Sequence, residues 1–281
     1  MGGEVTGSAL ERIDPAGLLS ALGLVQHGIV IDLSQPLDET IPMGAPGAFT
    51  PFSFTWRVTP EGDGRDQHYQ YSAETITGTL HVGTHIDGLA HVSAAGRAFG
   101  GRDIRAIRTD HGFSELGIET VAPIITRGIV IDVASTHGVE ALDDGYSISV
   151  EDLALALERD GLAVQAGDAV LVKTGKAREY GTDNAKYQAG QPGVSPEAAT
   201  WLYERGMAVL GTDTTGTEPL PFPDERNTTH QAMLVERGVH LVENLDLSRV
   251  GHGVATVGLF LCLPLRITGA TGSWVRPVLV T

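Results

Sequence analysis

Four side chains able to bind metals or transfer protons lie within eleven positions of the segment HVGTHIDGLAHV, residues 81–92. They are His81, His85, Asp87 and His91, in a chain that has ten histidines in all. A lone histidine is usually a core or surface residue with satisfied hydrogen bonds, but this density favours a chemical role. Two compatible roles are metal ligation and general base catalysis beside a metal-bound water.

The spacing can direct these side chains at one divalent ion. We expect His81 at the end of a strand, and Gly83 lets the backbone turn tightly after it. If a helix begins near Thr84, whose hydroxyl would cap it, Asp87 and His91 share one helix face. Asp87 has two oxygens and could bridge two ions. Three protein ligands with an open position are typical of catalytic zinc sites.

His91 has a second interpretation, as a base and not a ligand. The ordinary pKa of histidine, about 6.5, suits proton transfer near neutral pH. The sequence alone leaves both roles of His91 open.

A second polar patch lies in NTTHQAMLVERGVHLVENLDL, residues 227–247. His230 is expected to open a short helix, and Glu243 lies in an otherwise apolar strand. A carboxylate in such a strand needs a partner, which a metal ion would supply. The alternative is that Glu243 faces solvent.

The pattern of elements predicts a layered α/β fold with a mixed central sheet, as one domain over residues 1–281. Asp14 and Pro15 predict a helix that should stop at Gly28, and Ser149 and Ser195 predict two further helix starts. Continuous apolar runs predict buried strands. They lie at residues 28–34, 127–135, 169–175, 207–213, 240–245 and 258–265. The segment GIVID occurs twice, at 28–32 and 128–132, either through a structural duplication or through chance similarity of two central strands.

Composition excludes several classes of protein. The formal charge of −16, from 35 acidic and 19 basic residues, argues against nucleic acids and anionic membrane surfaces as partners. No apolar run approaches 18 residues, and no signal peptide is evident, so we expect a cytoplasmic protein. The single cysteine, Cys262, lies in an apolar run and should be a buried core residue.

Two further segments could contact a substrate. MGAPGAFTPF (residues 43–52) and the nearby Trp56 offer apolar walls, with Phe49 and Trp56 as candidate substrate-binding residues, although ordinary core packing is the alternative. GTDTTGTEP (residues 211–219) follows a predicted strand, where Asp213 or Thr214 could touch substrate or form a plain turn.

The motif H-x-G-T-H-x-D-x-x-x-H resembles the signature of the cyclase-like metal-dependent hydrolases, a family that includes bacterial kynurenine formamidase and isatin hydrolase. Residues 227–247 are similar to the distal segment of that family, and the resemblance covers most of residues 28–265. One departure is Leu89, where the family usually has proline two residues before the last histidine.

The resemblance implies a swivelling β/β/α-type domain and a hydrolase that opens an amide, lactam, imide or lactone. It implies a first metal on His81, His85 and Asp87, and a second, where present, on Asp87, His230 and Glu243. The ions would be one or two Zn²⁺ or one Mn²⁺. It further implies His91 as the proton carrier, a small aromatic or cyclic substrate, and a homodimer or homotetramer.

Two other functions remain open from the sequence. A metal-dependent cyclase or dehydratase would use the same ion to polarise a carbonyl for ring closure. A non-catalytic protein would hold the metal for structure alone.

Overall fold

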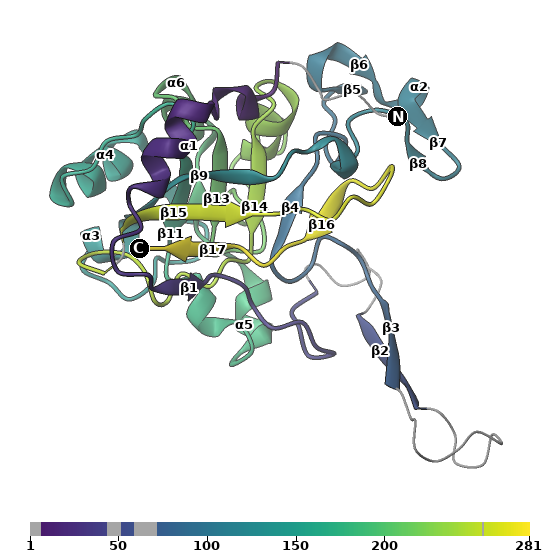
Figure 1. The fold of residues 1–281 in the computed structure, drawn as a ribbon, viewed down its shortest axis with the longest axis horizontal. Coiled ribbons are helices and arrows are strands. Elements are labelled where there is room, and N and C mark those ends of the chain that lie inside the picture. Colours follow the sequence, from purple (N-terminus) through teal and green to yellow (C-terminus); the bar gives the residue numbers. More distant parts are fainter. Residues whose placement is uncertain (1–6, 44–51, 59–71, 255) are drawn as a thin grey trace.

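The computed structural model describes residues 7–43, 52–58, 72–254 and 256–281. Within these ranges a nine-stranded mixed sheet forms the centre of the molecule (Figure 1). From edge to edge its strands are β1 (Val30–Asp32), β17 (Val278–Val280), β15 (Val257–Cys262), β9 (Ile124–Asp132), β11 (Ala169–Lys173), β13 (Val209–Thr212), β14 (His240–Glu243), β4 (His85–Asp87) and β16 (Gly272–Trp274). The predicted α/β fold with a mixed central sheet is confirmed.

The middle of the sheet is parallel, whereas both margins are antiparallel. β9, β11, β13 and β14 run parallel to their neighbours in this group. β15, β17 and β1 follow antiparallel beside β9, and β4 and β16 follow antiparallel beside β14. Successive side chains of β9 enter different cores: Ile129 and Ile131 join one buried cluster and Val130 joins the other. The apolar runs therefore reflect strands buried on both faces.

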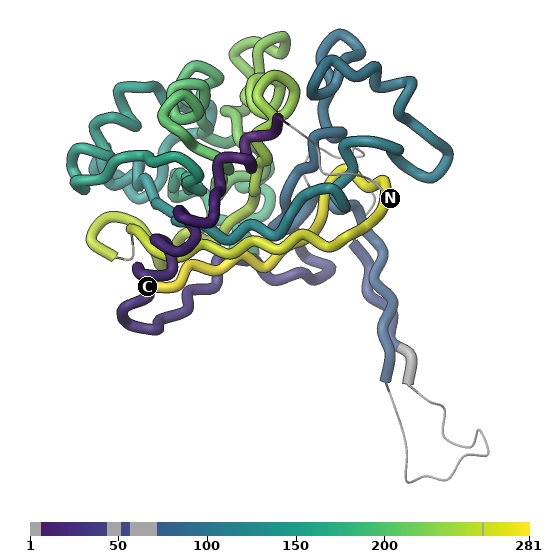
Figure 2. The backbone as a smooth tube through the Cα atoms, turned by 45° about the horizontal axis from the view of Figure 1, so that its top comes forward, coloured from purple at the N-terminus to yellow at the C-terminus, as the bar shows by residue number. Residues whose placement is uncertain are grey.

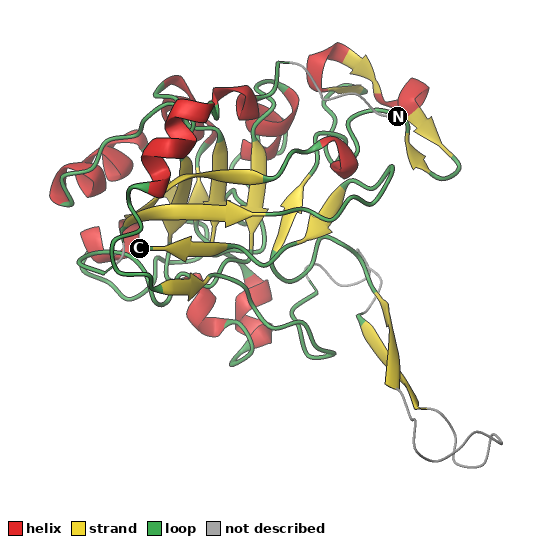
Figure 3. Cartoon of the chain, in the orientation of Figure 1, coloured by secondary structure: helices red, strands yellow, loops and turns green. Residues whose placement is uncertain are grey.

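Short helices cover the sheet, with α4 and α6 above it and α5 below it in the view of Figure 3. The α-helices are α1 (Pro15–Leu22), α2 (Ile104–Ile107), α3 (Val133–Thr136), α4 (Val150–Arg159), α5 (Asn184–Ala189) and α6 (Pro196–Glu204). The 3-10 helices are η1 (Ala9–Arg12), η2 (Phe99–Gly101), η3 (Ile118–Thr120) and η4 (Lys176–Glu179), and η5 (Gln231–Val235) is a π-helix. None of the described helices is long and apolar enough to cross a membrane.

The predicted helix starts are confirmed at three caps. Asp14 accepts a hydrogen bond from the backbone of Gly17, and Ser195 accepts one from Ala198. At α4, Ser149 and Asp152 form a reciprocal capping box, which satisfies two backbone N–H groups that the first helical turn leaves open.

Two predictions near the N-terminus were wrong, one on the length of a helix and one on the burial of a strand. α1 ends at Leu22 and not at Gly28, because Gly23 caps it and the chain continues in turns. β1 is an edge strand in which Val30 is 63% exposed, so it is not a buried strand. The two GIVID segments thus occupy an edge strand and a central strand, which favours chance similarity over duplication.

Four small two-stranded sheets complete the described chain. They are β2 (Ser53–Val58) with β3 (Ser72–Thr77), β5 (Arg97–Ala98) with β6 (Arg102–Asp103), β7 (Arg108–Thr109) with β8 (Gly112–Phe113), and β10 (Ser147–Ile148) with β12 (Gly193–Val194). The β2–β3 ribbon projects away from the main sheet, as both Figure 1 and Figure 2 show. Cys262 is fully buried, as predicted.

Candidate metal centre

The candidate centre lies where β4 pairs with β14. In this antiparallel ladder His85 stands directly opposite Glu243, and Asp87 follows two residues later on the same face of β4. His230 is the residue that precedes the π-helix η5, so it does open a short helical segment as predicted. All four side chains are buried or nearly so.

The predicted helix near Thr84 was wrong, because residues 85–87 form β4. Strands on both sides, β14 and β16, pair with β4, so its backbone is held in extended form. The Thr84 hydroxyl caps nothing; it donates to the carbonyl of Asn244 and accepts from the backbone N–H of Gln35. The turn at Gly83 is present, with φ of +62°, and an added Cβ would lie 2.3 Å from Leu37.

Four donor groups form a closed ring in which histidines and carboxylates alternate. His85 Nε2 lies 3.5 Å from Asp87 Oδ1 and 3.4 Å from Glu243 Oε2. His230 Nε2 lies 3.3 Å from Asp87 Oδ2 and 3.4 Å from Glu243 Oε1. Donor atoms bound to one tetrahedral zinc lie about 3.3–3.4 Å apart, given bond lengths of about 2.0–2.1 Å. Each neighbouring pair of the ring therefore has the spacing of two ligands of one ion, and each carboxylate directs one oxygen to each histidine.

Both ring histidines direct Nε2 into the ring and use Nδ1 for a hydrogen bond outside it. His85 Nδ1 lies 2.9 Å from the carbonyl oxygen of Gly83, to which it donates in this tautomer. His230 Nδ1 lies 2.5 Å from Glu218 Oε2 and donates to that carboxylate. A proton fixed on Nδ1 leaves Nε2 unprotonated in a neutral imidazole, which is the form that binds metals.

Asp87 is the residue that joins the cluster. Its side chain is fully buried, its Oδ1 lies 2.8 Å from His81 Nδ1, and its Oδ2 has no hydrogen-bond partner. Burial would raise the pKa of Asp87, but the charge of His91 and the nearby imidazoles of His230 and His81 hold it well below the ordinary value. A buried, ionised carboxylate with an unsatisfied oxygen fits a site for a cation.

His81 and His91 stack beside this ring. Their ring centroids are 3.8 Å apart at an interplanar angle of 17°. Both nitrogens of His81 are engaged, Nδ1 with Asp87 and Nε2 with the hydroxyl of Thr271 at 2.9 Å. His91 Nε2 lies 3.9 Å from Asp87 Oδ2, farther than the ring atoms lie from one another.

The electrostatics separate His91 from His230. Burial lowers the pKa of His91, Asp87 opposes this, and the charges of neighbouring histidines add to it, so that the pKa falls to about 4. Burial also lowers the pKa of His230, but the charges of Glu218 and Glu243 outweigh it and raise that pKa well above the ordinary value. His91 is therefore a neutral imidazole at neutral pH and can accept a proton.

The donor set fits a divalent metal. Two groups of three residues could each hold an ion, because within each group the ligand atoms lie within 4.8 Å of one another. One group is His85, Asp87 and Glu243, and the other is His81, Asp87 and His91. Asp87 belongs to both groups, as expected of a residue that could bridge two ions. Imidazole nitrogens with carboxylate oxygens suit zinc and manganese alike.

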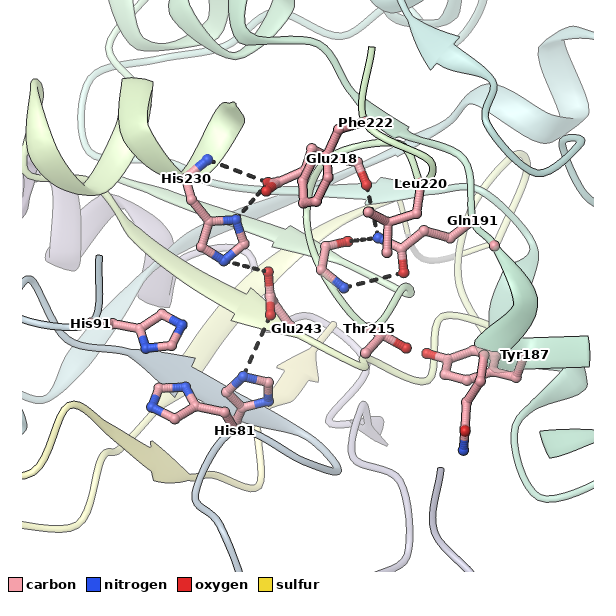
Figure 4. Close-up of a pocket in the computed structure, with 14 residues that line it drawn as sticks. His81, His91, Tyr187, Gln191, Thr215, Glu218, Leu220, Phe222, His230 and Glu243 are labelled. Atoms are coloured by element: carbon pink, nitrogen blue, oxygen red, sulfur yellow. Dashed lines mark hydrogen bonds and ion pairs between the residues drawn. The ribbon is translucent and has the colours of Figure 1, made fainter. Parts of the chain in front are cut away.

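A cavity of about 410 Å³ opens beside the cluster (Figure 4). Its lining residues are His81, His85, His91, Tyr187, Gln188, Gly190, Gln191, Thr215, Gly216, Glu218, Leu220, Phe222, His230 and Glu243. Tyr187 and Gln188 come from α5, whereas Leu220 and Phe222 come from the segment after β13. The cavity thus combines apolar lining residues with a group of histidines and carboxylates, which is typical of sites for small ligands.

The structure brings together six of the eight predicted site residues, namely His81, His85, Asp87, His91, His230 and Glu243. Phe49 lies outside the described residues. Trp56 is on β2 of the projecting ribbon, is 62% exposed and does not line the cavity. Its role in substrate binding stays a prediction.

Asp213 and Thr214 do not line the cavity, so the plain turn was the better interpretation for both. Asp213 is buried and accepts hydrogen bonds from Thr174 and Gly175, and the Thr214 hydroxyl donates to the carbonyl of Gly216.

The sequence interpretation missed Glu218 and Thr217, which contact His230 and Glu243 respectively. Both lie in GTDTTGTEP, whose position after a strand was the available signal. His240 was also missed: its Nδ1 lies 2.7 Å from the backbone oxygen of Asp87 and helps to fix that residue. Nothing in the sequence distinguishes His240 from an ordinary core histidine.

Fold and site together define an α/β protein with a histidine–carboxylate cluster at one end of a mixed sheet. Residues 31–219 match the family model for cyclases, described as "Putative cyclase". Since the match covers more than half of the chain, this protein belongs to that cyclase family, as the motif at residues 81–91 led us to expect.

Relatives of known name agree with this assignment. Kynurenine formamidase of Bacillus mycoides (strain KBAB4) is 27% identical over 251 residues, covering 89% of this chain and 96% of the relative. The kynurenine formamidase of Bacillus cytotoxicus is 28% identical over the same shares. The chain therefore aligns with nearly the whole length of these enzymes.

Solved structures show the same fold. A crystal structure of a novel cyclase has a TM-score of 0.87 at 24% identity, with 98% of this chain and 94% of that one covered. Isatin hydrolase A from Ralstonia solanacearum has a TM-score of 0.64 at 23% identity, covering 89% and 90%. Leu89, which departs from the family motif, is buried in the core beside the site.

Proposed function

We propose that this protein is a metal-dependent hydrolase that cleaves a small amide, lactam, imide or lactone. The observation that carries the proposal is the closed ring of His85, Asp87, His230 and Glu243, which borders a cavity that also contains the neutral His91. The names of the relatives, kynurenine formamidase and isatin hydrolase, support this class of reaction.

The ring residues would hold one divalent ion, which when bound activates water and polarises a carbonyl oxygen. If two ions bind, Asp87 would be shared between them, and His81, whose ligand atom lies within 4.8 Å of that of Asp87, would join one of the two ligand sets. Zinc and manganese both suit these ligands, and we propose one or two Zn²⁺ or one Mn²⁺.

His91 is placed to move the proton that hydrolysis requires. Water attack on an acyl carbon releases one proton, and cleavage of the C–N or C–O bond requires one on the leaving nitrogen or oxygen. His91 Nε2, close to Asp87 yet outside the ring, can take up the first proton and return it to the leaving group. The low pKa of His91 keeps it free to accept a proton at neutral pH.

The size and lining of the cavity favour a small aromatic or cyclic substrate. Tyr187, Leu220 and Phe222 supply ring and aliphatic surface, and Figure 4 shows His81, His91 and His230 on the side opposite Tyr187. Gln191 is buried and its amide is used in hydrogen bonds to backbone oxygens of Gly216 and Glu218, so it acts as a fixed wall.

A substrate panel tests the proposal. N-formylkynurenine, isatin, cyclic imides and lactones would be incubated with protein loaded with zinc or with manganese, and we expect ring opening or deformylation of at least one compound. The absence of turnover for all of them, with metal bound, would contradict a hydrolase and favour the alternative, a metal-dependent ring closure.

We also propose a homodimer or homotetramer, which sedimentation would test.

A further inference from the structure

Glu218 lies behind His230 on the side away from the ring. Its Oε2 lies 2.5 Å from His230 Nδ1 and 3.3 Å from the backbone nitrogen of the same residue. The side chain is 9% exposed, although it lines the cavity (Figure 4). A carboxylate in this position fixes the imidazole in two ways: it holds the proton on Nδ1, and it sets the plane of the ring.

The neighbouring residue acts on the other half of the ring. The Thr217 hydroxyl is fully buried and donates to Glu243 Oε1 at 2.9 Å. That same oxygen lies 3.4 Å from His230 Nε2. Two consecutive residues therefore contact two of the four ring residues. Glu218 accepts the Nδ1 proton of His230, and Thr217 donates to the carboxylate of Glu243.

The backbone of this segment is held firmly. The Gln191 amide donates to the carbonyls of Gly216 and Glu218 at 2.6 and 2.8 Å. Gly193 packs so closely that an added Cβ would lie 2.1 Å from the carbonyl carbon of Glu218. A rigid support is what a positioning residue needs, because a mobile carboxylate would not select one ring orientation.

We propose that Glu218 is a positioning residue of the metal centre, which holds His230 protonated at Nδ1 with Nε2 directed at the ion, and that Thr217 assists by orienting Glu243. This inference rests on the proposed metal-dependent function. Glu218 contacts His230 on its Nδ1 side, away from the ring, and so would act through that residue.

Metal affinity is the first test, measured by competition with a chromophoric chelator for zinc and for manganese. We expect Glu218→Ala to weaken binding about 10–100-fold. Glu218→Gln should lose less, because its amide oxygen can still accept from Nδ1. The matched control is Asp160→Asn, which alters another carboxylate 2.7 Å from a histidine, His252, outside the cavity; its metal affinity should equal that of the wild type.

The second readout is the Nδ1 proton of His230 in zinc-loaded, ¹⁵N-histidine-labelled protein. In the wild type a downfield, slowly exchanging proton is expected; it should be retained in Glu218→Gln and lost in Glu218→Ala. Thr217→Val should weaken metal binding while leaving this proton in place. If Glu218→Ala does not fold, the Gln variant and Thr217→Val carry the test.

Wild-type affinity in both Glu218 variants would overturn the inference, as would weakened binding with the His230 proton unchanged in Glu218→Ala. These failures differ from failure of the proposed function, which would appear as a wild-type protein that binds no metal.

Discussion

Replacement of His91 by asparagine separates proton transfer from metal binding. His91 Nε2 lies 3.9 Å from Asp87, whereas the ring contacts of His85 and His230 are 3.3–3.5 Å, so the ring should stay intact without His91. A positioned general base typically contributes about 10²–10⁴-fold. We therefore expect kcat to fall about 10²–10⁴-fold, equivalent to about 2.7–5.4 kcal/mol of barrier, with metal content unchanged.

The pKa of His91 also predicts the direction in which activity changes with pH. A base acts in its neutral form, and the pKa of His91 is lowered to about 4, so the neutral form dominates above about pH 4. Wild-type kcat/KM should rise with pH through this region and then level off, as far as His91 controls it. The variant should lack that rise.

The assay would measure kcat and KM across pH on the best compound of the panel, with metal content determined on the same samples. His111→Asn, which removes an exposed histidine outside the cavity, is the control and should behave as the wild type. Loss of metal together with His91 would refute the reasoning and make His91 a ligand. Full activity with metal retained would refute a role in proton transfer.

Three further perturbations have defined outcomes. Gly193→Ala would drive a Cβ to 2.1 Å from the backbone of Glu218, and we expect a loss of about 1–3 kcal/mol in the free energy of unfolding, with weaker metal binding; normal stability and affinity would contradict the close packing. Asp132→Asn should destabilise at pH 7, because the pKa of Asp132 is lowered: burial raises it, but the backbone hydrogen bond of Ser135 and the charge of Lys173 outweigh this. That contribution is present above the unfolded pKa of about 3.9 and is lost as the pH falls through the folded value, so urea unfolding of variant and wild type should converge in acid. Chelation should lower the free energy of unfolding by about 2.7 kcal/mol relative to protein at a free metal concentration of 100 Kd, as measured by thermal unfolding, and an unchanged melting temperature would argue against a bound ion.

The parts of the site that are local in sequence could be predicted from it. His81, His85, Asp87 and His91 fall in one short segment, and their types alone indicate metal or proton chemistry. The distal residues required the resemblance to the family, because only the β4–β14 pairing brings Glu243 opposite His85.

The errors at Thr84 and Val30 have a common physical cause, which is the position of each segment in the sheet. Thr84 has the chemistry of a helix cap, but β14 and β16 on either side hold residues 85–87 in a strand. Val30 has the apolar character of a buried strand, but β1 lies at the edge of the sheet and leaves it exposed. The local sequence pattern does not predict whether a strand lies in the middle or at the edge of a sheet.

Glu218 shows that a local signal can mark a segment without giving the role of a residue in it. In the sequence it is one carboxylate in a hydroxyl-rich turn, and its partner His230 lies twelve residues away across another segment. Its proposed role follows only from the structure, in which Glu218 lies 2.5 Å from His230 Nδ1 while Nε2 of the same imidazole faces the ring.

The central claim is that His85, Asp87, His230 and Glu243 form a metal centre. Elemental analysis of the purified protein tests it most directly, by counting bound zinc and manganese per chain. We predict one or two ions per chain in the wild type and none in Asp87→Asn, because Asp87 belongs to both groups of ligand atoms. A wild-type protein without metal after growth and dialysis in zinc or manganese, or an Asp87→Asn variant that binds both ions as the wild type does, would contradict the claim.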